Sequence, residues 1–157
     1  MAALIAYYGN TERAARMLAD ITGGELFVIQ QQIPYSDRYQ TCIEEAKRDL
    51  QNHARPTLIA LPEPGKAFTD VYLGYPNYWG TMPMAVYSFL EQMPLNGVTI
   101  HPFCTHEGSG LSNTEADIRA AVPGATVTAG LAIQGSRVDS ARPQLEKWVR
   151  ETGGGSQ

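Results

Sequence analysis

Short runs of apolar residues alternate along the chain with segments whose apolar residues recur at helical spacing. Four continuous runs predict strands, at residues 2–8, 70–75, 98–105 and 126–133. A shorter strand is expected at residues 25–30. Runs that are apolar at nearly every position are typical of parallel strands buried on both faces. The pattern therefore predicts a parallel sheet.

A helix is predicted after each of these strands. The first has Ala14, Leu18 and Ile21 on one face and ends at Gly23-Gly24, a usual C-terminal signal. Residues 55–66, with three prolines and a glycine, predict a wrapped loop or a short edge structure. The other helices are expected from Thr41 with Glu44 as a capping box, after Pro83, over residues 114–121 with Ser112 and Glu115 as a capping pair, and around Leu145, Trp148 and Val149.

Strands that alternate with helices imply right-handed βαβ units and a parallel sheet covered by helices on both faces. The expected fold class is α/β, a three-layer α/β/α sandwich. The chain of 157 residues suits one domain, predicted at residues 1–152. The glycine-rich residues 153–157 are expected to form a disordered tail.

Composition narrows the function classes. The net charge is −4, and no Lys/Arg stripe suggests nucleic-acid binding. No segment approaches the ~20 apolar residues of a membrane span, and no signal-peptide pattern follows Met1. The two cysteines, Cys42 and Cys104, are far apart and form no CxxC motif. A reducing, cytoplasmic location is therefore expected.

Three loops follow predicted strands and are expected to meet at one edge of the sheet. Residues 9–11 (Gly-Asn-Thr) open a helix, whose free N–H groups favour an anion such as phosphate. Residues 76–81 carry the adjacent Tyr78 and Trp79, a flat aromatic surface. Residues 105–110 contain two glycines, which let the backbone approach a ligand closely. Phosphate at one end and a flat ring at the other describe a mononucleotide, and FMN fits.

Two long motifs, at residues 74–83 and 102–110, resemble those of the flavodoxin-like family. The similar branch reads Gly-Tyr-Pro-x-aromatic-Trp-Gly-Thr-Met-Pro and Pro-Phe-Cys-Thr-His-x-Gly-Ser-Gly, and the resemblance extends from about Ala2 to Gly135. It implies a flavodoxin-like five-stranded parallel sheet of order 2-1-3-4-5 that binds FMN non-covalently. The implied contacts are Gly9, Asn10 and Thr11 to phosphate, and Pro76, Asn77, Tyr78, Trp79, Gly80, Thr105, His106, Glu107, Gly108, Ser109 and Gly110 to the ring.

One departure from the family lies in the first loop. Relatives usually read Ser-x-Ser/Thr-Gly-Asn-Thr there, whereas Tyr8 here runs directly into Gly9, so hydroxyl donors are lost. Three functions stay open. The chain is an FMN-binding electron-transfer protein serving redox partner proteins or a small electron acceptor, a binding module whose FMN site is remodelled or lost, or an FMN-dependent NAD(P)H oxidoreductase. Glu107, if near the ring, is expected to lower the flavin potential.

Other chemistry is not supported by the residue pattern. Strand alternation places His101 on the opposite face from Cys104 and His106, so a metal site is not expected. A pair of Ser109 and His106 has no third member and no nucleophile elbow. No catalytic side chain is predicted.

Overall fold

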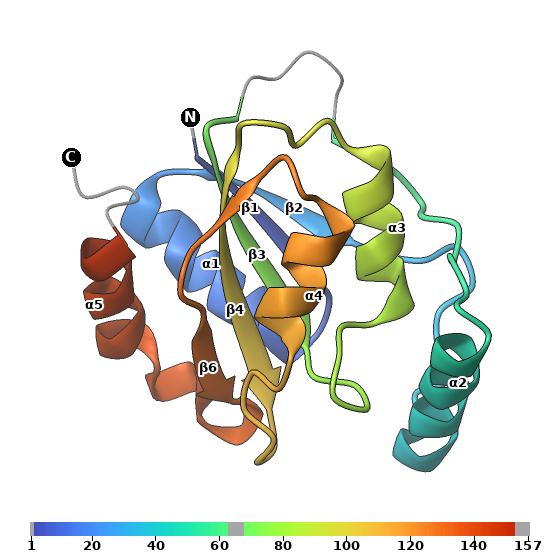
Figure 1. Ribbon diagram of the computed structural model, residues 1–157. Coiled ribbons are helices and arrows are strands. Elements are labelled where there is room, and N and C mark those ends of the chain that lie inside the picture. The colour runs from blue at the N-terminus through green and yellow to red at the C-terminus, as the bar shows by residue number, and fades with distance from the viewer. Residues whose placement is uncertain (1, 63–67, 153–157) are drawn as a thin grey trace.

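The computed structural model describes residues 2–62 and 68–152. It has the predicted three layers, with a parallel sheet between helices (Figure 1). The tail predicted to be disordered lies outside the described residues. The elements are β1 (Ala2–Tyr7), α1 (Asn10–Thr22), β2 (Glu25–Ile29), α2 (Tyr39–Gln51), β3 (Asp70–Pro76), α3 (Met84–Gln92), β4 (Thr99–His106), α4 (Thr114–Ala121), β5 (Thr126–Val127), β6 (Leu131–Gln134), the 3₁₀ helix η1 (Gly135–Ser140) and α5 (Arg142–Thr152).

The sheet has the strand order β2-β1-β3-β4-β5, and each neighbouring pair is parallel. β1 lies between β2 and β3, so Ile5 pairs with Phe27 on one side and Leu73 on the other. Residues 3–7 of β1 are buried, as their continuous apolar run predicts. The predicted fold class and strand order are confirmed.

The last strand is not the single element predicted at residues 126–133. It is divided into β5 and β6, which both pair with β4, and the pairing register changes by one residue between them. The break lies beside Pro102 of β4, which has no N–H to donate to the ladder. The carbonyl of Ala129 accepts a hydrogen bond from the indole of Trp148 instead (3.2 Å).

Each face of the sheet carries its own apolar cluster. α1 and α5 cover one face, and α3 and α4 cover the other (Figure 1). The first cluster includes Leu18, Tyr72 and Trp148, and the second includes Phe89 and Ile118. α2 lies to one side, beyond the β2 edge (Figure 1). Within the described ranges, no helix is long and apolar enough to cross a lipid bilayer.

The start of α2 differs from the prediction. The helix begins at Tyr39, two residues before Thr41, and its N-cap makes no side-chain hydrogen bond. The predicted capping box of Thr41 and Glu44 is therefore wrong. The next carboxylate, that of Glu45, instead accepts a hydrogen bond from the N–H of Ser36 (2.8 Å), which ties the preceding loop to the helix.

The predicted cap of α4 is also wrong, although the helix spans the predicted residues. Asn113 is the N-cap and makes no side-chain cap bond. Ser112 Oγ donates to the carbonyl of Ser109 (3.3 Å), and Glu115 accepts from the N–H of Gly130 (2.7 Å). Glu115 thus holds the bend between β5 and β6.

Two other predictions are confirmed. Gly23 ends α1 with a φ of 75°, and its N–H donates to the carbonyl of Ala19 (2.8 Å). The described part of residues 55–66 includes a short edge structure, because Gln31 and Leu58 form an antiparallel bridge.

Candidate functional site

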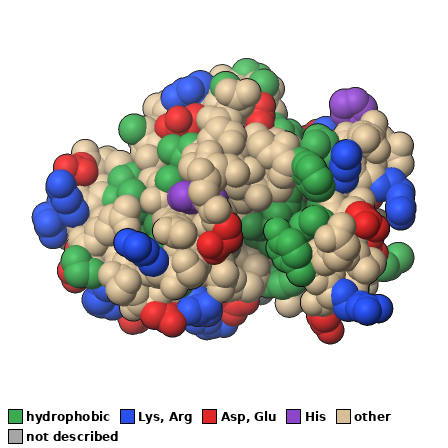
Figure 2. All heavy atoms as spheres, turned by 90° about the horizontal axis from the view of Figure 1, so that it is seen from below, with side chains coloured by type: hydrophobic (Ala, Val, Ile, Leu, Met, Phe, Trp, Pro, Cys, Tyr) green, Lys and Arg blue, Asp and Glu red, His purple; other side chains and the backbone are tan. Residues whose placement is uncertain are grey.

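A cavity of about 560 Å³ opens where the strands end at their carboxyl termini. Figure 2 shows this face, with hydrophobic side chains gathered where the part at the right, α2 in Figure 1, approaches the body of the molecule. All of the predicted site residues line the cavity except Gly108 and Gly110. The three predicted loops therefore meet in one place.

The first loop joins β1 to α1 with almost no spacer. Gly9 has a φ of 93°, which favours glycine, and α1 begins at the next residue, Asn10. The hydroxyl of Thr11 is buried and shares a 2.7 Å hydrogen bond with the hydroxyl of Thr105 at the end of β4. The first main-chain N–H groups of α1 have no acceptor within the helix. They are the donors that this loop offers to an anion.

Arg13 brings a cation to the same helix start. Its guanidinium donates to Asn10 Oδ1 (2.6 Å) and to Asp139 Oδ1 (2.5 Å). The Asp139 carboxylate of η1 therefore partly neutralises the positive charge of Arg13, and the hydrogen bond from Arg13 fixes the orientation of the Asn10 side chain.

The aromatic loop is a tight turn closed by a bridge between Tyr78 and Thr81. Trp79 and Gly80 both have positive φ, 57° and 85°. This backbone is uncommon for a bulky residue and is a local strain often found at functional sites. The side chain of Asn77 supports the turn by accepting from the N–H of Gly80 (2.9 Å). The turn holds the Trp79 side chain half exposed at the cavity.

Tyr78 lies deeper than its neighbour. Its ring meets that of Tyr7 edge-on, with centroids 6.1 Å apart. Burial, with smaller contributions from Cys42 and Tyr8, raises the pKa of Tyr78 above its ordinary value. The Tyr78 hydroxyl is therefore neutral at physiological pH, and the ring offers an uncharged wall.

The third loop supports the aromatic turn as well as the cavity. The carbonyl of Gly110 accepts a hydrogen bond from Asn77 Nδ2 (2.9 Å). His106 Nδ1 accepts from the N–H of Gly108 (2.9 Å), which turns the backbone behind the His106 ring. Gly108 and Gly110 have φ of 131° and 65°, so both positions favour glycine. The two predicted residues that do not line the cavity thus shape the loop that does.

Four lining residues were not predicted: Tyr8, Tyr39, Ile43 and Gly135. Tyr39 and Ile43 are four residues apart on α2, the spacing of one helix face. That spacing was a usable signal, but the place of α2 beside the cavity depends on contacts between distant residues. Tyr8 stacks on Tyr7, with ring centroids 4.6 Å apart.

The alternative chemistries gain no support from the geometry. Among residues 2–62 and 68–152, no group of three or more His, Cys, Asp or Glu could hold a metal ion. His101 is buried, stacks on Tyr72 and is hydrogen-bonded to Asp70 (2.8 Å) and Thr128 (3.0 Å). Cys104 belongs to the cluster on the other face. His101 therefore has a structural role.

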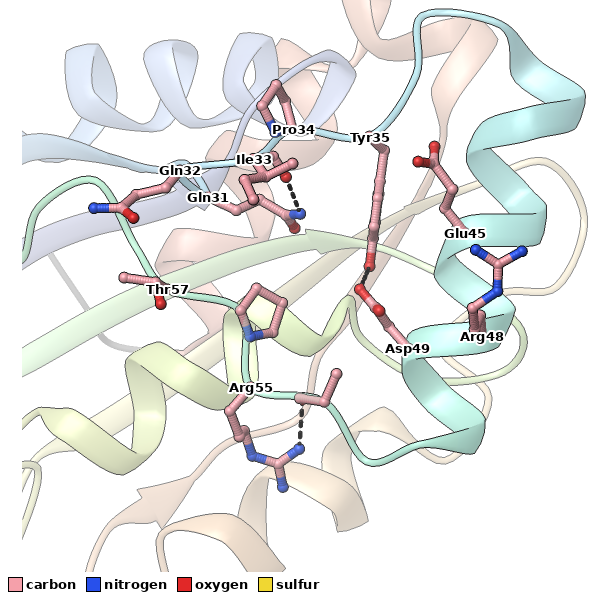
Figure 3. A pocket seen from close by; sticks show the side chains of 12 residues that line it. Gln31, Gln32, Ile33, Pro34, Tyr35, Glu45, Arg48, Asp49, Arg55 and Thr57 are labelled. Carbon is pink, nitrogen blue, oxygen red and sulfur yellow. Dashed lines mark hydrogen bonds between the residues drawn. The ribbon is translucent and has the colours of Figure 1, made fainter.

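A second cavity, of about 400 Å³, lies on the other side of α2 (Figure 3). Tyr35 donates to Asp49 Oδ2 (2.5 Å), and Gln31 Nε2 donates to the carbonyl of Ile33 (2.9 Å). Arg55 is hydrogen-bonded to Glu91 (2.8 Å). These polar groups satisfy one another rather than converge on a ligand.

Comparisons with known proteins agree on the fold. A family model described as Flavodoxin matches residues 1–152. A candidate flavoprotein from Bacteroides uniformis is 24% identical, covers 94% of this chain and 97% of its own, and superposes with a TM-score of 0.82. A Lactobacillus acidophilus flavoprotein in complex with FMN is 19% identical, with 88% and 96% covered and a TM-score of 0.68. No curated protein matches.

Proposed function

This chain belongs to the flavodoxin family, and we propose that it binds FMN non-covalently and transfers electrons through it. The observation that carries the proposal is the meeting of an aromatic turn, a helix start and a glycine-containing loop in one cavity. When bound, the flavin would supply the redox chemistry, while the protein sets its orientation and electrostatic surroundings.

The ring end of the cavity fits a flavin. Trp79 is half exposed although it is a large apolar residue, and its turn is held rigidly by Asn77. A flat ring that covers this exposed aromatic face removes apolar area from water on both partners, which favours binding. Tyr78 on this wall, with His106 and Ser109 lining the cavity from the third loop, would enclose the isoalloxazine.

The opposite end offers main-chain donors to a phosphate. Gly9, Asn10 and Thr11 line the cavity at the start of α1. Free N–H groups and the helix dipole both favour an anion at this position. The hydroxyl of Thr11 is engaged with Thr105, so its contribution to phosphate is its N–H. This end supplies fewer side-chain donors than the usual family loop.

A titration with FMN tests the proposal. Binding should quench flavin fluorescence and shift the visible spectrum at micromolar FMN. Trp79→Ala removes one ring wall and should weaken binding about tenfold, by analogy with the 1–3 kcal/mol of base stacking on aromatic side chains. Absence of any spectral change at micromolar FMN would instead favour a binding module with a lost cofactor site.

The redox partner is either another protein or a small electron acceptor, and a reducing, cytoplasmic compartment suits the two free thiols of Cys42 and Cys104. An FMN-dependent NAD(P)H oxidoreductase is the second candidate. Its supporting observation is that the cavity extends to Tyr39 and Ile43 on α2, beyond the residues expected to hold FMN. NADH or NADPH oxidation with a quinone acceptor distinguishes the reductase from the electron carrier.

A further inference from the structure

The family resemblance implies a contact of Glu107 with the ring, but the structure places its carboxylate at the end of the cavity where α1 begins. Its Oε1 atom accepts a hydrogen bond from the N–H of Ser136 (2.9 Å). A Cβ atom built on Gly135 would come within 2.6 Å of this oxygen and 3.0 Å of Asn10 Nδ2. Glu107 Oε1 and Asn10 Nδ2 thus lie close to the same point, so the two side chains are neighbours.

No cation of the described residues forms an ion pair with Glu107. The nearest basic side chain on α1 that the contacts identify, Arg13, is paired with Asp139 and hydrogen-bonded to Asn10. The described hydrogen bonds give the Glu107 carboxylate one partner, the N–H of Ser136. No described side-chain cation therefore pairs with this negative charge beside the helix start.

We propose that Glu107 determines the flavin specificity of the cavity by opposing the phosphate group of FMN. The inference rests on the proposed function, because it assumes that the phosphate lies at the start of α1. A phosphate monoester carries about −1.5 to −2 charges near pH 7. At a separation of about 6 Å in water-like surroundings and at low ionic strength, repulsion by a carboxylate would lower the affinity for such a group about tenfold.

Riboflavin is the matched ligand for this test, since it has the same ring and no phosphate. Its affinity depends on Tyr78 and Trp79 but not on the charge of Glu107. The structure thus predicts a smaller preference for FMN over riboflavin than the helix start alone would give. Removing the charge restores that preference.

The experiment compares dissociation constants for FMN and riboflavin by fluorescence quenching in the wild-type protein and in Glu107→Gln. Glutamine keeps an oxygen that accepts from Ser136, and the exposed position allows the change without loss of the fold. Glu151→Gln on α5 makes the same change in net charge away from the cavity and serves as the control.

Glu107→Gln should tighten FMN about tenfold and change riboflavin by less than about twofold, while Glu151→Gln changes neither. The FMN gain should shrink in 1 M salt, which screens the repulsion. Equal changes for both flavins, or no change for FMN while riboflavin binds normally, would overturn the inference alone. If no protein binds either flavin, the proposed function itself is wrong.

Discussion

The indole Nε1 of Trp79 donates a 2.8 Å hydrogen bond to the main-chain carbonyl of Ile43, in the middle of α2. Lys47, one turn further along α2, holds its ammonium 4.9 Å from the centre of the Trp79 ring. The aromatic turn and α2 are therefore joined where both line the cavity. A ring bound beside Trp79 would stabilise the turn and the helix together.

Trp79→Phe should loosen α2 while keeping an aromatic face in the cavity. The variant loses one hydrogen bond, which contributes about 1 kcal/mol net. We expect amide exchange over residues 39–51, measured by mass spectrometry, to accelerate about fivefold. Lys47→Met, which removes only the cation, should have a smaller effect. Unchanged exchange in Trp79→Phe would show that α2 is held by its other contacts.

Thr11→Val should destabilise the protein without a matching loss of ring binding. The substitution leaves the buried hydroxyl of Thr105 without its 2.7 Å partner. An unpaired buried hydroxyl costs about 1–3 kcal/mol, whereas replacing both partners with apolar groups is nearly neutral. The double variant Thr11→Val/Thr105→Val should therefore recover much of the stability in urea unfolding. An additive loss in the double variant would contradict this reading.

The layers of the fold were predictable because burial on both faces demands continuous apolar runs. Residues 2–7 and 70–75 have that pattern and lie at the centre of the sheet. The interruption near Pro102 was not predicted, although a proline inside a strand is a known ladder defect. Whether such a defect ends the neighbouring strand depends on groups such as the Trp148 indole, which is distant in sequence.

The predicted site residues lie in loops at strand ends, whereas Tyr39 and Ile43 on α2 were missed. Tyr8 and Gly135 were also missed, although each directly follows a strand. Pro76 and Thr105 occupy adjacent parallel strand ends, which topology brings together. Tyr39 and Ile43 reach the cavity because Trp79 and the loop before α2 hold that helix in place. Such tertiary contacts have no local signal in the sequence.

Gly74→Ala should be strongly destabilising. A Cβ at this position would lie 2.3 Å from Phe103 Cζ and 2.8 Å from Thr11 Cγ2, and Phe103 is fully buried. Overpacking of this kind costs about 1–3 kcal/mol. Thermal unfolding should show a clear drop in Tm. Phe103→Leu removes the ring atoms that the new Cβ would meet. Phe103→Leu should therefore cost less stability in the Gly74→Ala background than in the wild-type protein. Strictly additive losses of stability would argue against a steric conflict.

Asp70→Asn should lower stability in a pH-dependent way. Partial burial alone would raise the pKa of Asp70, but hydrogen bonds from His101 and Thr69 outweigh burial and lower it. A carboxyl with a lowered folded pKa stabilises the fold above its unfolded pKa, and this is lost as pH falls through the folded pKa. We expect a cost of about 1 kcal/mol at pH 7.

Urea unfolding from pH 7 to pH 2 measures this difference. It should begin to shrink as the pH falls through the unfolded pKa of about 3.9, and disappear only below the lowered folded pKa, where Asp70 is protonated and as uncharged as asparagine. Asp37→Asn, at an exposed position, should match wild type throughout. A difference that stays constant down to pH 2 would assign the effect to packing rather than to ionisation.

The two thiols should react at very different rates. Burial raises the pKa of Cys104 to about 12, and this side chain is fully buried. Burial also raises the pKa of Cys42, but this residue is only partly covered on α2.

Because the thiolate is the reactive form, a disulfide reagent at pH 8 should modify Cys42 slowly and Cys104 only after unfolding. Cys42→Ser should therefore leave no thiol that reacts in the folded protein, and mass spectrometry identifies the modified residue. Bound FMN should slow Cys42 further, because this thiol lies beside Tyr78 of the cavity wall. Modification of Cys104 at the rate of Cys42 in the folded protein would show that the second apolar cluster opens more readily than its burial implies.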